Sequence, residues 1–152
     1  MKKIMLEIFF DIKKEIMCVE KELRRIVRDS DPIIKDSSFH LLNAGGKRLR
    51  PAFSFLGGKF YNYDYKKILP LAVALELVHM ATLVHDDVVD SSVTRRNIST
   101  VKALWGNKIS THLGDYLFGV SLKLIAGYDN PIIAREMADA SVKMCDVFPP
   151  IS

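Results

Sequence analysis

The sequence predicts an all-α fold, and three observations carry that prediction. Apolar residues recur at intervals of three and four over long stretches of the 152-residue chain, which is the period of an amphipathic helix. No stretch alternates apolar and polar residues as a half-buried strand does. Glycine and proline number only 8 and 6, and most of them fall where the periodic stretches stop. We therefore expect a single helical domain over residues 1–152, with an atypical tail at 147–152.

The expected helices are separated by turn residues. The first carries an apolar stripe from Met5 to Ile26 and ends before Asp31-Pro32, because the residue preceding a proline disfavours helix. The later elements follow in this order: a helix from Pro32 to Gly45-Gly46, one from near Pro51 to Gly57-Gly58, a loop over 59–67, a strongly apolar helix opened by Pro70 and running through Val89, a polar segment over 91–100, a helix over 109–126, and a last helix over 132–145 before Pro149-Pro150.

Charge, cysteines and hydropathy exclude several classes of protein. The net charge of +4 suits anionic partners, but no dense run of Lys and Arg marks a nucleic-acid surface. Cys18 and Cys145 form no CxxC pair, so free thiols in a reducing compartment are expected. Acidic residues interrupt the apolar N-terminal stretch, which argues against a secretion signal. No uninterrupted apolar run approaches the about 18 residues of a membrane span, so we expect a cytoplasmic protein.

Three carboxylates stand together at the end of the most apolar expected helix. Asp86, Asp87 and Asp90 lie within five residues, and at helical spacing their like charges repel. The helix dipole also disfavours negative charge at a C-terminus, and no Lys or Arg follows within the next turn. A Mg²⁺ ion held by carboxylates and substrate phosphates would resolve this conflict. The segment therefore predicts a magnesium site for a phosphorylated substrate.

A cationic turn lies earlier in the chain. The segment Gly45-Gly46-Lys47-Arg48-Leu49-Arg50-Pro51 places three cations within four residues. Its glycines let the backbone approach a ligand closely, and a guanidinium offers phosphate a rigid two-pronged fork. A solvated turn between helices explains this run equally well when it is taken alone. Arg95-Arg96 is a second cationic pair, which in isolation is more often a surface feature than a ligand site.

His79 is aligned with the acidic segment. It lies seven residues before Asp86 and so shares that helix face, two turns away. A lone histidine on an apolar helix is usually a core residue, but this alignment makes a functional role equally expected. Glu76, one turn below, is placed to orient His79 by a hydrogen bond. His85 faces elsewhere on the helix and is expected to be structural.

Together these segments resemble the polyprenyl diphosphate synthase family, the trans-isoprenyl chain-elongating enzymes. Residues 45–51 match the family's GGKRxRP element, and residues 76–90 match its ExxHxASLxHDDxxD stretch, with Thr82 where serine is common. Arg95-Arg96 falls at the family's arginine pair, and residues 114–117 are similar to its GDxL element. The resemblance covers residues 39–146 and is closest to the long-chain, heptaprenyl-type members.

The resemblance implies an isoprenoid-synthase-type helical bundle and a Mg²⁺-dependent prenyltransferase. Such an enzyme condenses isopentenyl diphosphate with an allylic diphosphate to give a long-chain polyprenyl diphosphate. Matched position by position, the resemblance implies these roles: Asp86, Asp87 and Asp90 hold Mg²⁺ on the allylic diphosphate, Arg95 contacts that diphosphate, and Lys47, Arg50, His79 and Arg96 hold the diphosphate of isopentenyl diphosphate. The departing diphosphate takes the proton, so no protein base is essential.

The resemblance also bears on product length. In the family, bulky aromatic residues four or five positions before the first aspartate close the floor of the cavity that receives the growing chain. Ala81 and Thr82 occupy those positions here, and both are small. The resemblance therefore implies a product longer than a farnesyl chain.

The sequence departs from the family in its length and in its C-terminal part. Family members are longer and carry a second aspartate-rich motif on a later helix, whereas no second DDxxD occurs here. After residues 142–146 the family pattern gives way to an apolar tail with two prolines. We therefore expect the N-terminal helices of such a bundle, truncated, frameshifted or split, and weak or inactive alone. Expected assemblies are a homodimer or a hetero-oligomer with a missing half or second subunit, and the lipid product allows peripheral membrane contact.

Other functions remain open at this point. An HD-type metal phosphohydrolase would use His79, His85 and Asp86, but it leaves the other two aspartates without a role. A class I terpene cyclase shares the acidic magnesium motif, yet it has no use for the cationic turn. The main alternative is a non-catalytic, diphosphate-binding remnant or an interaction subunit of a split synthase.

Overall fold

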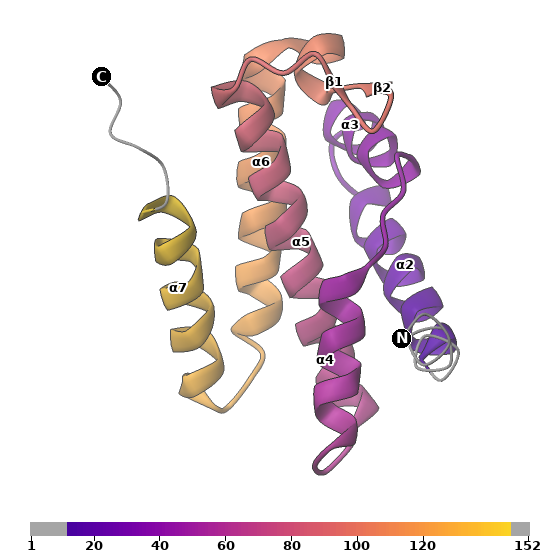
Figure 1. The fold of residues 1–152 in the computed structure, drawn as a ribbon, viewed down its shortest axis with the longest axis vertical. Coiled ribbons are helices and arrows are strands. Elements are labelled where there is room, and N and C mark those ends of the chain that lie inside the picture. Colours follow the sequence, from indigo (N-terminus) through magenta and orange to yellow (C-terminus); the bar gives the residue numbers. More distant parts are fainter. Residues whose placement is uncertain (1–11, 147–152) are drawn as a thin grey trace, which may run out of the picture.

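The structure, a computed structural model, describes residues 12–146 and is built almost wholly of helices (Figure 1). The elements are α2 (Lys13–Arg28), α3 (Pro32–Asn43), α4 (Leu49–Lys59), α5 (Tyr65–Val89), β1 (Thr94–Arg95), β2 (Ile98–Ser99), α6 (Val101–Ile125) and α7 (Pro131–Asp146). The all-α prediction is confirmed. The start of the first apolar stripe and the tail at 147–152 lie outside the described residues.

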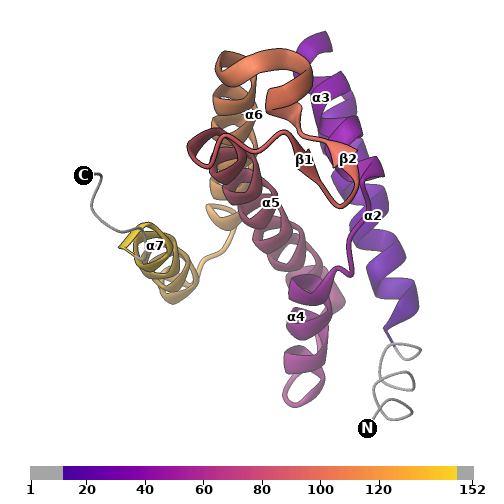
Figure 2. The ribbon, with the colours of Figure 1, turned by 45° about the horizontal axis from the view of Figure 1, so that its top comes forward.

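Helix α5 is the centre of the bundle. Helix α6 runs back along it, while α4 and α2 flank it on the other side (Figures 1 and 2). The largest fully buried side chains of this core include Phe55, Leu77, Leu113 and Leu117, and burial of each stabilises the fold by about 2 to 3 kcal/mol. A smaller hydrophobic cluster joins α7 to α5 and α6. It is formed by Ala74, Val78, Ile125 and Met137.

Helix α5 begins at Tyr65, so the expected start at Pro70 is wrong. Asp64 is the N-cap, and its Oδ1 accepts the Lys66 N–H at 3.0 Å, which satisfies one of the free amides of the first turn. Pro70 is accommodated inside the helix, although it removes one helical hydrogen bond. Ile68 and Leu69 pack against the main core, so burial holds this turn in place.

Two other boundaries differ from the sequence prediction. Helix α4 continues through Gly57 and Gly58 to Lys59. A Cβ at Gly58 would collide with the side chain of Ile68, so this glycine allows α4 and α5 to approach closely. Helix α6 begins at Val101, eight residues earlier than expected, because Thr100 caps it and Gly106 bends it with a φ of 80°. That bend breaks the apolar period on which the prediction relied.

The polar segment 91–100 contains a short antiparallel hairpin, which the sequence analysis did not expect. Thr94 pairs with Ser99, and Arg95 pairs with Ile98. The two turn residues, Arg96 and Asn97, have φ values of 53° and 64°, as in a type I′ turn. The turn lacks the Asn-Gly or Asp-Gly sequence that usually predicts a type I′ turn.

Within the described residues, α5 is the helix whose length and composition would allow it to cross a membrane. Its most apolar window has a mean hydropathy of 1.7, and half of that window is buried inside the bundle. The helix also carries Glu76, His79, Asp86 and Asp87, and Asp90 is its C-cap. Its packing is therefore that of a core helix.

Candidate diphosphate and metal site

One face of α5 is left partly uncovered from Leu71 onward, although Leu71 and Leu75 also pack against the smaller cluster. The half-buried or exposed residues on this open face, spaced by fours and threes, are Leu71, Leu75, His79, Thr82, Asp86 and Asp90. His79 and Asp86 therefore share a face, as their spacing predicts. Ala81 does not belong to the open face, because it is 1% exposed and packs in the core. Thr82 does belong to it, and its hydroxyl donates to the His79 carbonyl at 2.9 Å.

The acidic end of α5 comprises Asp86, Asp87 and Asp90, which have different surroundings. Asp87 is 3% exposed, and its Oδ1 accepts a hydrogen bond from Arg95 Nε at 2.9 Å. Asp86 stays on the open face, where burial and then the neighbouring charge of Asp90 raise the pKa of its carboxyl. Over residues 12–146, no three His, Cys, Asp or Glu side chains converge as a ready metal cage. The acidic end thus presents two carboxylates to a ligand and uses the third internally.

Arg48 is the centre of a buried ionic cluster. It is 7% exposed and lies at the N-cap of α4 in a left-handed conformation, with φ 46° and ψ 42°. Its Nε donates to Glu20 Oε1 at 2.8 Å, and its Nη1 donates to Glu76 Oε1 at 2.8 Å. Its Nη2 also lies 2.7 Å from Glu20 Oε1. An uncommon backbone conformation held by two carboxylates indicates a strongly determined turn.

This cluster corrects the role expected for Glu76 and explains the shape of the cationic turn. Glu76 binds Arg48 rather than orienting His79. Because Arg48 points into the protein, its neighbours Lys47 and Arg50 remain exposed. This role of Arg48 was not predicted from the sequence. The acidic Glu20 and Glu76 on otherwise apolar helix faces are the sequence feature that indicates a buried cation between them.

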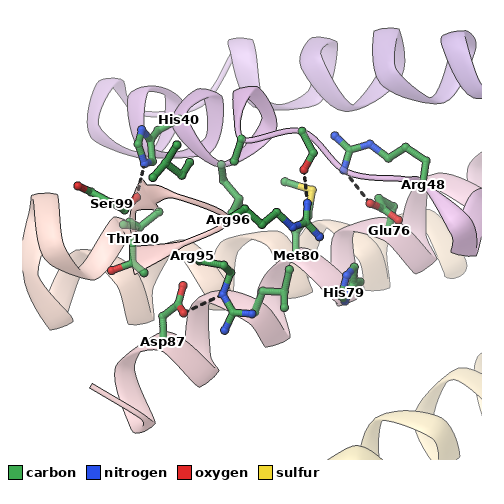
Figure 3. Close-up of a pocket in the computed structure, with 16 residues that line it drawn as sticks. His40, Arg48, Glu76, His79, Met80, Asp87, Arg95, Arg96, Ser99 and Thr100 are labelled. Atoms are coloured by element: carbon green, nitrogen blue, oxygen red, sulfur yellow. Dashed lines mark hydrogen bonds and ion pairs between the residues drawn. The ribbon is translucent and has the colours of Figure 1, made fainter. Parts of the chain in front are cut away.

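The hairpin brings the second arginine pair to the same place. Arg96 Nη1 donates to the Gly45 carbonyl, which ties residues 51 positions apart in the chain. Gly46 allows this approach, since a Cβ there would lie 3.1 Å from Nη1 of both Arg48 and Arg96. The hairpin is anchored from α3, where His40 Nε2 donates to the Ser99 carbonyl at 2.7 Å (Figure 3). The two cationic segments are therefore held together without a ligand.

The result is a cationic pocket, a cavity of about 410 Å³ that adjoins a smaller one beneath the hairpin. It is lined by Ala44, Gly45, Gly46, Lys47, Arg48, Leu49, Arg50, Glu76, His79 and Arg96. All four residues predicted to hold the diphosphate of isopentenyl diphosphate thus meet in a single pocket: Lys47, Arg50, His79 and Arg96. Figure 3 shows Arg48, His79, Arg95 and Arg96 converging from three different segments.

The pocket carries a positive field before any ligand binds. Burial, followed by the charges of Arg50, Arg96, Arg48 and Arg95, lowers the pKa of His79 to about 4. His79 is consequently neutral at physiological pH and offers hydrogen bonds without adding charge. A pocket with fixed guanidinium groups, a lysine and a neutral histidine is suited to a phosphate-rich anion.

His85 has the structural position that its spacing predicts. Its ring lies between α5 and α6, with Nε2 3.2 Å from Asp115 Oδ1. A Cβ at Gly114 would overlap the His85 ring. The Gly-Asp pair of residues 114–115 therefore provides room and a partner for this histidine.

Comparison with known proteins places the chain in a single family. The family described as Polyprenyl synthetase matches residues 31–146. The chain is 42% identical over 134 residues to "Heptaprenyl diphosphate synthase component 2" of Bacillus subtilis (strain 168), covering 88% of this chain and 38% of that protein. It is 34% identical to "Nonaprenyl diphosphate synthase" of Mycobacterium tuberculosis, covering 88% of this chain and 40% of the relative.

Solved structures of prenyl diphosphate synthases share the fold of this chain. Heptaprenyl diphosphate synthase from Staphylococcus aureus superposes with a TM-score of 0.84 at 35% identity, over 89% of this chain and 43% of that one. A polyprenyl synthase from Caulobacter crescentus, complexed with calcium and isoprenyl diphosphate, superposes with a TM-score of 0.85 at 32% identity, over 91% of this chain and 42% of that one. The chain spans about two fifths of the length of these relatives.

Proposed function

Because the chain belongs to the polyprenyl synthetase family, we propose that it supplies the diphosphate-binding wall of a prenyltransferase of isoprenoid biosynthesis. The reaction condenses isopentenyl diphosphate with an allylic diphosphate and gives a long-chain polyprenyl diphosphate. One observation carries the proposal: Lys47, Arg50, His79 and Arg96 line one pocket, beside a separate acidic end on the same helix face. Two charged sites of opposite sign fit two diphosphate substrates, one bound directly and one bound through a metal.

The cationic pocket is the proposed site for isopentenyl diphosphate. Its guanidinium groups bind phosphate oxygens in pairs, and Lys47 adds a mobile point charge. Neutral His79 completes the site at the foot of the acidic face. The pocket therefore fixes the position of the substrate whose double bond attacks, and holding the two reactants together removes much of the entropic barrier.

The acidic end is the proposed site for Mg²⁺ and the allylic diphosphate. Asp86 and Asp90 suit a hard cation. The burial of Asp86 and the charge of Asp90 raise the pKa of the Asp86 carboxyl, and a bound cation would stabilise its ionised form. Mg²⁺ commonly takes one or two carboxylates together with substrate phosphates. Bound there, the metal would neutralise the diphosphate as it leaves. A relative bound to calcium and isoprenyl diphosphate supports a divalent ion in this role.

Arg95 and Asp87 are proposed to act as a pair at this end. Their ion pair holds the Arg95 guanidinium beside the acidic end, where it adds positive charge next to the allylic diphosphate. The departing diphosphate takes the proton released in the condensation. Leu75 and Leu71 continue the open face as an apolar lane, which receives the growing chain and keeps water from the reacting carbons.

Product length is proposed to depend on the open face of α5. Ala81 and Thr82 were both predicted to leave the cavity floor open, but Ala81 is buried in the core. Phenylalanine at Ala81 would overpack the bundle, whereas phenylalanine at Thr82 would project along the lane. We expect Thr82→Phe, in a form competent for elongation, to shorten the product measured by chromatography. An unchanged product distribution would refute this role for Thr82.

The proposal is tested by binding and activity measured on the same purified 152-residue chain. Isothermal titration with isopentenyl diphosphate, and with an allylic diphosphate plus Mg²⁺, should give two separable binding events. Arg50→Gln should weaken the first and Asp86→Asn the second. Absence of both events would overturn the proposal.

Elongation measured with labelled isopentenyl diphosphate then separates the proposal from its alternative. Sustained elongation by this chain would mean that these residues suffice. Binding without turnover would favour a diphosphate-binding remnant or an interaction subunit of a split synthase. We expect weak activity from the chain alone, because it spans about two fifths of its relatives' length.

Partners and compartment are part of the same proposal. Relatives named as component 2 of heptaprenyl diphosphate synthase support a hetero-oligomer with a second component, and a homodimer is the alternative. Chemical cross-linking followed by mass measurement distinguishes the two. We propose a cytoplasmic location, with a lipid product that brings the protein to a membrane surface.

A further inference from the structure

An aromatic tip projects from the bundle outside the site described above. It consists of residues 60–67, which form the connection from α4 to α5 and the first turn of α5. Phe60 is 91% exposed and Tyr61 is 85% exposed. In Figure 1 this tip is the lowest point of the molecule, while the acidic end of α5 lies at the top. Two adjacent aromatic side chains in water contribute nothing to the core, and an exposed apolar patch of this kind often marks an interaction site.

The base of the tip is anchored. Tyr63 Oη donates to Glu15 Oε1 at 3.2 Å, and the ring of Tyr65 stacks on buried Phe55 with centroids 6.1 Å apart. Asp64 caps α5. Phe60 and Tyr61 therefore project from a fixed base, which lowers the entropy lost when they insert into a partner.

The charges around the tip favour an anionic partner. Lys59, Lys66 and Lys67 flank the aromatic pair. Two acidic residues oppose them: Glu15 lies 3.7 Å from Lys59, and Asp64 lies 3.8 Å from Lys67. The three lysines outnumber these two carboxylates. Aromatic rings beside lysines are the combination found at the boundary between water and a lipid headgroup layer.

We propose that the aromatic tip docks on an anionic lipid surface, with Phe60 and Tyr61 entering the headgroup layer and Lys66 and Lys67 facing the lipid charges. A lipid surface fits better than a protein groove, because the aromatic pair sits on a narrow projection and is flanked by three lysines. The docking itself rests on exposure and charge, and it stands independently of the proposed reaction.

The position of the tip adds a consequence that does rest on the proposed function. The 25 residues of α5 span about 37 Å, with the diphosphate site at one end and the tip at the other. The apolar lane of Leu75 and Leu71 leads from His79 toward the tip. A growing hydrocarbon chain would therefore be directed toward the membrane, while its diphosphate stays in water.

Vesicle flotation of the whole 152-residue chain tests the docking. The vesicles are phosphatidylcholine alone, or phosphatidylcholine with an equal share of phosphatidylglycerol. Phe60→Ser/Tyr61→Ser should lower the partition coefficient at least about tenfold on the anionic vesicles. Lys66→Glu and Lys67→Glu should each lower it about fivefold there and leave the weak binding to neutral vesicles unchanged.

A matched control removes two exposed apolar side chains from the opposite end of the bundle. Val93→Ser/Leu104→Ser should float like the unmodified chain, since these residues, 65% and 52% exposed, lie far from the tip. Failure of the unmodified chain to float, or equal flotation of the tip variant, would overturn the proposal. A lower molecular mass of the tip variant in vesicle-free solution would also overturn it, because the tip would then be a contact between copies. Diphosphate titration of the same variant should be unchanged, which separates this test from that of the proposed function.

Discussion

The cationic pocket and the acidic end of α5 are two charged regions that the fold treats in opposite ways. The pocket draws its cations from a turn, a hairpin and a helix, and several of them have a partner inside the protein. Arg48 binds Glu20 and Glu76, and Arg96 binds the Gly45 carbonyl. The acidic end takes its three carboxylates from one helix terminus, and within residues 12–146 only Asp87 of the three forms an internal ion pair, with Arg95.

This difference separates structural charge from ligand-binding charge. In the pocket, internal ion pairs fix the loops that present Lys47 and Arg50 to solvent, so the site is organised before a ligand arrives. At the acidic end, Asp86 and Asp90 keep their mutual repulsion until a cation binds. Substitution of the internally paired Arg48 should therefore change folding, and substitution of Asp86 on the open face should chiefly change ligand binding.

The largest effect is expected from Arg48→Met. It leaves Glu76, and in part Glu20, without a buried cation, and removal of one partner from a buried ion pair costs about 3 kcal/mol or more. We expect the free energy of unfolding in urea to fall by that amount. Arg50→Met, an exposed cation on the same turn, is the matched control and should change stability by less than about 0.5 kcal/mol. Equal losses in the two variants would contradict the structural role of Arg48.

The second effect in size is expected from Asp87→Asn. The substitution keeps the shape of the side chain but removes the charge that holds Arg95, and a weakened buried hydrogen bond to a charged group costs about 1 to 2 kcal/mol. Urea unfolding measures this loss. Asp139→Asn, at an exposed position on α7, is the control and should be neutral. A neutral result for Asp87→Asn would place this aspartate with the ligand-binding carboxylates.

The same contrast explains what the sequence could predict. His79, Asp86 and Asp90 were placed correctly on one face because helical periodicity relates residues a few turns apart. The roles of Arg48 and Glu76 depend on contacts across 28 residues and on a left-handed backbone, which no local pattern announces. Ala81 and Thr82 are adjacent in sequence, yet one faces the core and the other the open side. Motif matching treats both as cavity residues, whereas helix geometry separates them.

The third prediction concerns the field inside the pocket. In the protein without a ligand, His79 has a pKa of about 4, against 6.5 for an ordinary histidine. Burial and the charges of the neighbouring arginines cause this shift. The unfolded chain therefore takes up a proton between pH 6.5 and about 4 that the folded chain does not, so the contribution of His79 to stability falls as pH falls through that window. Inorganic pyrophosphate should offset the arginine charges and raise the pKa of His79 toward 6.5.

Titration of the histidine ring resonances by nuclear magnetic resonance measures this shift. Arg50→Gln should raise the pKa of His79 in the free protein, because it removes the largest charge contribution to the depression. The resonances of His112, which lies outside the pocket, serve as the internal control for pyrophosphate addition. A pKa of His79 that does not respond to pyrophosphate would remove this residue from the diphosphate site.

The smallest effect on stability is expected from Asp86→Asn. Unlike Arg48→Met and Asp87→Asn, this substitution should stabilise the protein. Burial and the charge of Asp90 raise the pKa of Asp86 above 3.8, so its ionised form costs the fold stability above that pKa. Removing the charge should stabilise the metal-free protein by a few tenths of a kcal/mol, the size of a like-charge pair at this helical spacing. The gain over the unmodified chain should shrink as pH falls through the titration of Asp86, because protonation then removes the same charge.

Magnesium should reverse the order of the two proteins. With Mg²⁺ and pyrophosphate the unmodified chain gains stability through binding, whereas Asp86→Asn should gain little. Thermal unfolding with and without the ligands, beside Asp139→Asn, measures both signs in one experiment. A variant that is destabilised without metal would show that Asp86, like Asp87, is held by the fold, and the distinction between the two charged regions would fail at that residue.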